Sequence, residues 1–198
     1  MNLPNKLTLL RILLVPFFVA LLLLTAIPHS FLLAGVVFAA ASVTDYFDGH
    51  IARKHNLITD FGKFADPLAD KILVISAFVC FVQLGIIGAV PVIIVLLREF
   101  AVTSVRLMAA SKGSVVAANM WGKAKTVSQI IAISAVLLFH YILQLVTMGL
   151  LPFAAYIKQI TMAVTVLDNI FVWISVLFAV ISGVIYLFDN REFFANAA

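Results

Sequence analysis

Six long runs of apolar residues constrain the fold of this chain more than any other feature. They cover residues 7–26, 31–54, 62–84, 90–111, 119–146 and 162–188. A helix needs about 20 residues to cross a bilayer, and backbone polar groups in lipid are satisfied only in helices or closed barrels. With 64% hydrophobic and 11% charged residues, the chain is too apolar for a soluble domain. We therefore expect one all-α domain over residues 1–198, a polytopic membrane protein with about six transmembrane helices.

The first apolar run follows a basic start, as a signal peptide does, but it is long, contains Pro16 and lacks a convincing cleavage site. We expect it to be retained as a helix. Asn5, Thr8 and Arg11 would then form one polar strip on that helix, at positions i, i+3 and i+6. The strip either faces the protein interior, or Arg11 extends to the lipid headgroups. The spacing leaves both interpretations open.

The positions of the cationic residues indicate the orientation in the membrane. If the N-terminus is cytoplasmic and there are six spans, twelve of the 13 Lys and Arg residues belong to the cytoplasmic half, and only Lys158 lies outside it. This bias predicts that both termini face the cytoplasm. The net charge of +4 is then explained by topology and anionic lipid, with no need for a nucleic-acid partner. Cys80 is the only cysteine, which excludes an intrachain disulfide.

Five of the nine acidic residues lie between positions 45 and 70, at the ends of two apolar runs. We expect the second of these helices to begin near Gly62, so that Pro67 falls in its first turn, where a missing N–H costs nothing. Helical spacing sorts the polar and small residues into two strips, one with Asp45, Asp48, Gly49 and Arg53 and the other with Gly62, Asp66 and Asp70. Two antiparallel helices joined by a short loop would bring these strips together.

Four carboxylates in one small volume cannot all be ionised unless cations accompany them. Mg²⁺ and Mn²⁺ prefer oxygen ligands and keep positions open for water or a substrate phosphate, and pairs of such ions are common in phosphoryl transfer. We therefore predict a site for two divalent ions. A network of salt bridges to Arg53, Lys63 and Lys71 is one alternative. A proton or cation transporter is another, but its acids should continue toward the far side of the membrane, and we expect the outer halves of the six runs to be essentially uncharged.

The motif D-x2-D-G-x2-A-R-x8-G-x3-D-x3-D resembles the signature of the CDP-alcohol phosphatidyltransferase family. It is supplied by Asp45, Asp48, Gly49, Ala52, Arg53, Gly62, Asp66 and Asp70. The similarity extends to N-L-P-N-K-L-T-L-L-R at the start, to R-E-F-A-V-T-S-V-R from Arg98 to Arg106, and to W-G-K-A-K-T from Trp121 to Thr126. These outer segments are similar to family members that use sn-glycerol 3-phosphate as the acceptor.

The resemblance implies an enzyme of phospholipid biosynthesis that transfers the phosphatidyl group of CDP-diacylglycerol to sn-glycerol 3-phosphate, giving phosphatidylglycerol phosphate and releasing CMP. It implies that Asp45, Asp48 and Asp66 bind metal and that Asp70 is a metal ligand or the catalytic base. The residues implied around the CDP-lipid are Gly49, Ala52, Arg53 and Gly62. A homodimer and a location in the bacterial inner membrane are also family-level expectations. The alternatives are another acceptor, such as serine, inositol phosphate or phosphatidylglycerol, or an aspartate-rich membrane prenyltransferase.

A phosphate on the acceptor requires cationic or hydroxyl donors beside the metals. Because a regular helix turns about 100° per residue, Arg98 and Arg106 project about 80° apart and could line one cavity, whereas Lys123 and Lys125 project about 200° apart and could not both face it. Lys112 stays open as a further candidate. The residues we expect to bind the acceptor phosphate are Arg98 and Arg106 first, and then Lys125, Arg11 and Thr8.

Overall fold

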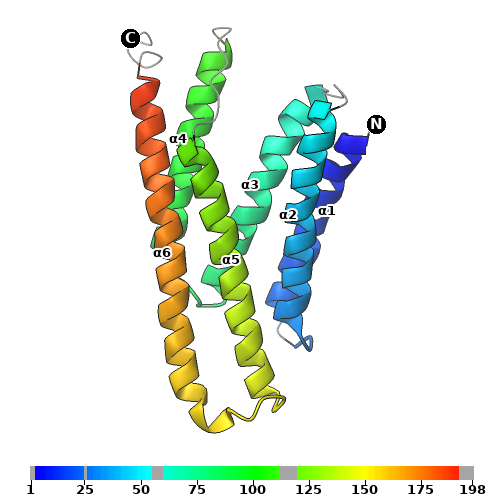
Figure 1. Ribbon diagram of the computed structural model, residues 1–198, viewed down its shortest axis with the longest axis vertical. Coiled ribbons are helices and arrows are strands. Elements are labelled where there is room, and N and C mark those ends of the chain that lie inside the picture. The colour runs from blue at the N-terminus through cyan, green and yellow to red at the C-terminus, as the bar shows by residue number, and fades with distance from the viewer. Residues whose placement is uncertain (1–2, 25, 55–59, 112–119, 192–198) are drawn as a thin grey trace.

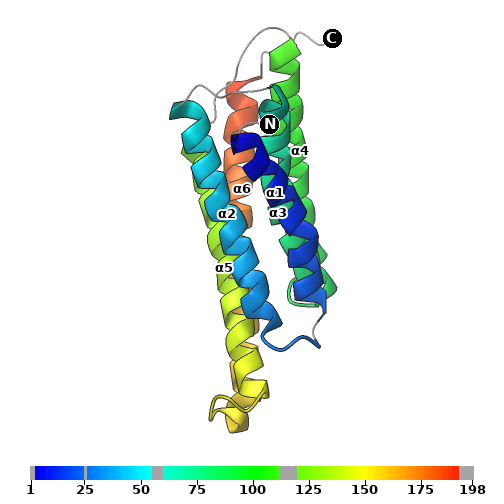
Figure 2. The ribbon, with the colours of Figure 1, turned by 90° about the vertical axis from the view of Figure 1, so that its right-hand side faces the viewer.

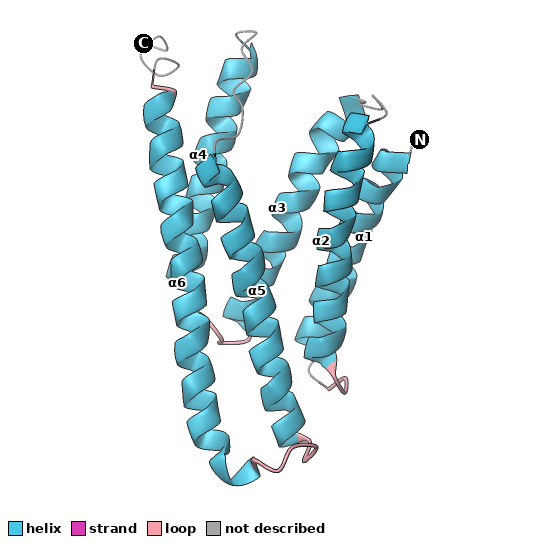
Figure 3. Cartoon of the chain, viewed as in Figure 1, coloured by secondary structure: helices cyan, strands magenta, loops and turns pink. Residues whose placement is uncertain are grey.

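The structure is a computed structural model that describes residues 3–24, 26–54, 60–111 and 120–191. Within these ranges it describes the side chains except those of residues 3–4, 45–54, 60–67, 70 and 111. The described residues form helices and no strand, so the all-α prediction is confirmed (Figure 3). The helices are α1 (Leu3–Leu23), α2 (Ser30–Lys54), α3 (Asp60–Gln83), α4 (Ala89–Ser111), α5 (Met120–Thr147), the short 3₁₀ helix η1 (Ala154–Tyr156) and α6 (Ile157–Asp189).

The six α-helices run alternately up and down an elongated bundle (Figure 1). We call the end at which α1, α3 and α5 begin the charged end, because the acidic motif lies there, and the other end the far end. Helix α1 packs against α2 and α3, and α6 packs against α4 and α5. Contacts of α2 with α5, and of α3 with α4 and α5, join these two groups. In the turned view, α1 begins and α6 ends at the same end of the bundle (Figure 2).

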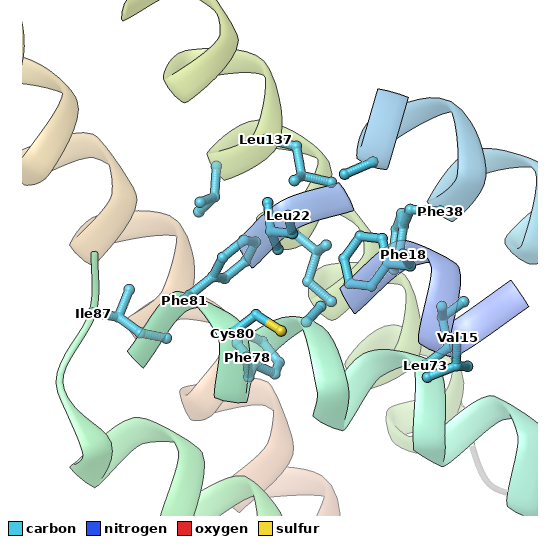
Figure 4. Close-up of a cluster of buried hydrophobic side chains, with 14 of the residues drawn as sticks. Val15, Phe18, Leu22, Phe38, Leu73, Phe78, Cys80, Phe81, Ile87 and Leu137 are labelled. Carbon is cyan, nitrogen blue, oxygen red and sulfur yellow. The ribbon is translucent and has the colours of Figure 1, made fainter. Parts of the chain in front are cut away.

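The main apolar core joins the first group of helices to α5 (Figure 4). Phe18 of α1 packs against Phe38 of α2, with ring centroids 5.9 Å apart, and Leu137 of α5 belongs to the same cluster. Cys80 of α3 is buried in this core. A smaller cluster of Val95, Val176 and Ala179 joins α4 to α6.

Two glycines reverse the chain at the far end. Gly85 after α3 and Gly149 after α5 have φ angles of 69° and 74°, a left-handed conformation that costs glycine little. The amide of Ile86 donates to the carbonyl of Phe81, at 2.9 Å, and closes the end of α3. The chain can therefore turn tightly into the next helix.

The surface of the bundle is suited to lipid. Large apolar side chains are exposed on every helix, including Phe17, Leu97 and Phe100, which are 64–67% exposed, and so extensive an apolar surface indicates a membrane or a partner. Three described stretches are long and apolar enough to cross a bilayer, Asn5–Leu23, Met120–Thr147 and Ala154–Asp189, and two shorter apolar helical stretches are Ser30–Thr44 and Lys71–Gln83. The protein is therefore a polytopic membrane protein.

Several predicted boundaries differ from the structure. Helix α1 (Leu3–Leu23) begins and ends a few residues before the predicted run 7–26. Helix α3 begins at Asp60, so Pro67 lies in its second turn and not in the first. The amides that lack a helical partner are those of the first turn, and Pro67 lies beyond them. Helix α6 begins at Ile157, earlier than the expected position 162. Lys158 lies within its first turn and does not keep residues 157–161 out of the helix. The outer connection is correspondingly shorter than predicted.

The expectation of uncharged outer halves is wrong. Asp168 of α6 is 1% exposed, and its Oδ2 lies 2.9 Å from Nε2 of His140 on α5. The ring of Phe31 from α2 stacks on His140, with centroids 5.3 Å apart. Pairing allows these polar groups to lie inside an apolar bundle, so the far half contains a polar link between α5 and α6.

Candidate active site

The acidic motif spans the junction of α2 and α3 at the charged end. Asp45, Asp48, Gly49, Ala52 and Arg53 lie in the last turns of α2, and Gly62, Asp66 and Asp70 lie in the first turns of α3. The helical spacing used to predict the two strips is therefore present in the backbone. The side chains of these eight residues lie outside the described part, so the facing of the two strips stays a prediction.

A buried carboxylate, Glu99 of α4, lies deeper in the bundle and is surrounded by cations from three helices. Its Oε1 accepts from Nη1 of Arg98 at 3.0 Å and forms a salt bridge with Nζ of Lys125 on α5. Its Oε2 lies 3.9 Å from Nζ of Lys71 on α3. We call Lys71, Arg98, Glu99 and Lys125 the Glu99 cluster. It joins α3, α4 and α5, and it carries three cationic groups for one carboxylate.

Two adjacent residues of helix α6 contact the side chain of Arg98. Nη2 of Arg98 donates to Oγ of buried Ser182 at 2.7 Å. A Cβ added at the next residue, Gly183, would lie 2.8 Å from Cγ of Arg98, closer than carbon atoms approach without a shift. The absence of a side chain at Gly183 therefore makes room for the stem of Arg98. Ser182 lies about 10 Å along the axis from the end of α6, which gives the approximate depth of the cluster.

The structure distinguishes the two lysines of α5. Lys125 is 8% exposed and faces Glu99, whereas Lys123 is exposed. The prediction that a regular helix directs them to different sides is confirmed. Lys112, the other lysine considered for the acceptor, lies outside the described residues.

Arg106 lies about two turns of α4 beyond Arg98 and faces the same side of α6, closer to the charged end. Its Nε lies 3.4 Å from the hydroxyl of Tyr186, and its Cζ lies 5.6 Å from the centroid of that ring. Ser182 and Tyr186 are four residues apart and share a face of α6. Both arginines therefore project toward one helix face, but Arg106 is exposed and Arg98 is largely buried.

The polar strip on α1 faces inward. Asn5, Thr8 and Arg11 are 7%, 0% and 1% exposed, and each interacts with other groups of the protein. Arg11 therefore does not extend to the lipid headgroups, and the snorkelling alternative is wrong.

The acidic motif and the Glu99 cluster both include a residue of α3, since Asp70 directly precedes Lys71. The sequence indicates Arg98 and Lys125 as acceptor ligands, and the depth of Arg98 and Glu99 in their apolar run suggests that both line a cavity. It offers Lys71 only as a salt-bridge partner of the motif carboxylates, and it gives no role to the α6 residues Ser182, Gly183 and Tyr186. The local signals were a glutamate next to an arginine within an apolar run and a Ser-Gly pair in a transmembrane helix, a composition that permits close helix approach. Neither signal indicates which helices meet.

This fold and site define a class: a polytopic helical membrane protein with an acidic motif at one end of the bundle and a buried cationic cluster beneath it. Comparison with known proteins gives the family. The model of the CDP-alcohol phosphatidyltransferase family matches residues 1–181. The chain therefore belongs to the CDP-alcohol phosphatidyltransferase family, and the resemblance seen in its motif is confirmed.

Individual relatives agree with this family. The chain is 44% identical to the CDP-diacylglycerol–glycerol-3-phosphate 3-phosphatidyltransferase of Bacillus subtilis (strain 168), over 96% of each chain. It is 38% identical to the protein of the same name from Rickettsia bellii (strain RML369-C), over 69% of this chain and 75% of the relative. It is 42% identical to a probable phosphatidylglycerophosphate synthase of Mycobacterium tuberculosis (strain ATCC 25618 / H37Rv), over 67% of this chain and 64% of the relative.

Proposed function

We propose that this protein transfers the phosphatidyl group of CDP-diacylglycerol to sn-glycerol 3-phosphate, forming phosphatidylglycerol phosphate and CMP. The observation that carries the proposal is the 44% identity, over 96% of each chain, to a relative named for this reaction. The Glu99 cluster supports it independently, because buried cations suit an acceptor that carries a phosphate dianion. Serine has no such group and would not need these cations.

The motif carboxylates fit a site for divalent metal. Four aspartates, Asp45, Asp48, Asp66 and Asp70, offer only oxygen ligands from two helix ends, and this donor set suits Mg²⁺ or Mn²⁺. When bound, such ions would neutralise charge that develops on the transferred phosphate. Gly49, Ala52, Arg53 and Gly62 would contact the CDP-lipid, as the family resemblance implies.

The chain's own groups would orient the acceptor and accept its proton. In the proposed reaction, a free hydroxyl of glycerol 3-phosphate attacks the phosphorus bonded to diacylglycerol, and the bond from that phosphorus to the oxygen of CMP breaks. Asp70 accepts the hydroxyl proton as general base. Arg98 and Lys125 bind the acceptor phosphate, with Arg106, Arg11 and Thr8 as further ligands. Since Lys71 follows Asp70 on α3, the base and the cationic cluster would lie at about the same depth along that helix.

An acceptor panel tests the proposal. Purified protein with CDP-diacylglycerol and Mg²⁺ or Mn²⁺ should release CMP with glycerol 3-phosphate and not with serine, inositol phosphate or phosphatidylglycerol. Asp70→Asn should abolish turnover while the protein remains extractable and folded, and a chelator should abolish it reversibly. Release of CMP with serine alone would contradict the acceptor, and activity retained in Asp70→Asn would contradict the role of the base.

The proposal includes a location and an assembly state. We propose that the protein lies in the bacterial inner membrane with six spans, with both termini and the charged end on the cytoplasmic side, where a soluble acceptor can reach the site. The homodimer implied by the family resemblance stays a prediction, which the molar mass of the detergent-solubilised protein would test.

A further inference from the structure

Glu99 is a buried carboxylate to which the proposed reaction gives no role. It is 6% exposed and lies on α4, away from the acidic motif on α2 and α3. Its partners are cations from its own helix and from two others. A glutamate in such a position needs an explanation, because a buried charge is costly unless it is paired.

The first effect of Glu99 is on charge. Arg98 and Lys125 are largely buried cations, and Glu99 is the carboxylate that both of them contact. Without the carboxylate, Arg98 and Lys125 would be buried like charges that favour separation or loss of a proton. With it, the two cations can stay charged side by side, as the binding of a phosphate requires.

The second effect is on geometry. A single oxygen, Oε1 of Glu99, accepts from Nη1 of Arg98 at 3.0 Å and also contacts Nζ of Lys125. It therefore ties a cation of α4 to a cation of α5. Ser182 fixes the other end of the guanidinium at 2.7 Å. Arg98 is held from both sides in one orientation.

One donor of the held arginine is unused. Nε of Arg98 is buried and has no hydrogen-bond acceptor among the described groups. A buried donor without an acceptor is uncommon in a folded protein. It points to a ligand that brings an acceptor oxygen, as a phosphate would.

We propose that Glu99 is a positioning residue of the acceptor subsite, which holds Arg98 and Lys125 together as a pair that binds the phosphate of the acceptor. The inference rests on the proposed function, because the phosphate is that of glycerol 3-phosphate. Glu99 does not contact the reacting atoms. It acts through the two cations.

The test is the kinetics of Glu99→Gln, which keeps the size of the side chain and removes its charge. The KM for glycerol 3-phosphate should rise about tenfold or more, as expected when a charged hydrogen bond is lost from binding. The KM for CDP-diacylglycerol, measured on the same protein, should stay within about twofold. Asp189→Asn, at an exposed carboxylate of α6, is the matched control and should leave both values unchanged. An unchanged or lower KM for glycerol 3-phosphate in Glu99→Gln would overturn the inference.

A second variant and a binding measurement separate positioning from folding. Glu99→Asp keeps the charge but shortens the side chain, so its KM for glycerol 3-phosphate should lie between those of the wild type and Glu99→Gln. If Glu99→Gln does not fold and Glu99→Asp has a wild-type KM, the role is structural and the inference is wrong. Calorimetric binding of glycerol 3-phosphate distinguishes the two proposals. A wild type that binds it without releasing CMP contradicts only the proposed reaction, whereas no binding, or equal binding by wild type and Glu99→Gln, contradicts the positioning role.

Discussion

At the scale of single residues, burial distinguishes cationic side chains of the same type that lie on the same helix. Lys123 and Lys125 are two lysines in the first turns of one helix, but only Lys125 reaches the Glu99 cluster. Arg98 and Arg106 both project toward α6, but only Arg98 is largely buried. A buried cation with an ionised partner is held in one orientation, whereas an exposed one is screened by solvent. We therefore expect the affinity for the acceptor to depend on Lys125 more than on Lys123, and on Arg98 more than on Arg106.

The two lysines provide a matched pair of variants. Lys125→Ala should raise the KM for glycerol 3-phosphate about tenfold or more, because it removes a buried cation from the phosphate site. Lys123→Ala should change that KM by less than about twofold, because an exposed lysine contributes little. Steady-state CMP release at varied acceptor concentration measures both values. Equal effects of the two substitutions would contradict the assignment of Lys125.

At the scale of elements, α6 acts as a support for α4 and α5. Near the charged end, Ser182 and Gly183 hold Arg98 of α4. In the far half, Asp168 pairs with His140 of α5. The same helix therefore serves the site with one part of its length and the stability of the bundle with another. Substitutions in the first part should therefore affect acceptor binding, and substitutions in the second part should affect stability.

A glycine substitution tests the support for Arg98. Gly183→Ala would place a Cβ 2.8 Å from Cγ of Arg98, so the stem of the arginine must move and the KM for glycerol 3-phosphate should rise. Gly35→Ala is the control, because a Cβ there meets nothing within 4 Å. Both changes raise helix propensity by up to about 1 kcal/mol, so propensity cannot account for a difference. An acceptor KM that is unchanged in Gly183→Ala would show that Arg98 does not need this space.

The His140 pair should affect stability and not the reaction. Asp168→Ala removes the hydrogen-bond partner of the partly exposed His140, which should cost about 1 kcal/mol, and should lower the melting temperature in detergent. The KM for glycerol 3-phosphate should not change, because the pair lies in the far half of the bundle. Asp189→Ala, at an exposed carboxylate of the same helix, should leave the melting temperature unchanged. A raised acceptor KM in Asp168→Ala would show that the far half is coupled to the site.

At the scale of the whole molecule, the bundle has polar chemistry toward one end and lipid-facing surface along its sides. The acidic motif, the Glu99 cluster and the inward strip of α1 are contributed by α1 to α5, with α6 holding Arg98. Such a site suits a reaction between a lipid donor in the membrane and a charged acceptor in water. The acceptor must reach it from the side of the membrane that the charged end faces.

Cysteine labelling tests the orientation. Cys80 is buried and is the only cysteine, so Cys80→Ala gives a background without thiols. Lys158→Cys, near the start of α6 at the far end, should react with a membrane-impermeant maleimide in intact cells. Arg191→Cys, just beyond the end of α6, should react only after the membrane is opened. Labelling of Arg191→Cys in intact cells would place the charged end outside.

The sequence by itself determined the helices, the membrane class and the family, because these depend on local properties. Apolar length indicates helices in lipid, and the D-x2-D-G motif and its continuation lie within two adjacent helix ends. Helical periodicity also separated Lys123 from Lys125, since both lie on one helix. Periodicity gives the direction of a side chain relative to its own helix and no information about which other helix lies there.

Only the tertiary structure decided which distant residues meet. Glu99 contacts Lys71 and Lys125 from two other helices, and Arg98 lies against Gly183, far along the chain. The packing of α4 and of α5 against the same two helices, α3 and α6, creates these contacts, and no spacing within α4 predicts them. For the same reason Asp168 and His140 were overlooked in their separate apolar runs. The helix directions followed from the sequence, but the partners of its buried charges followed from how the helices pack.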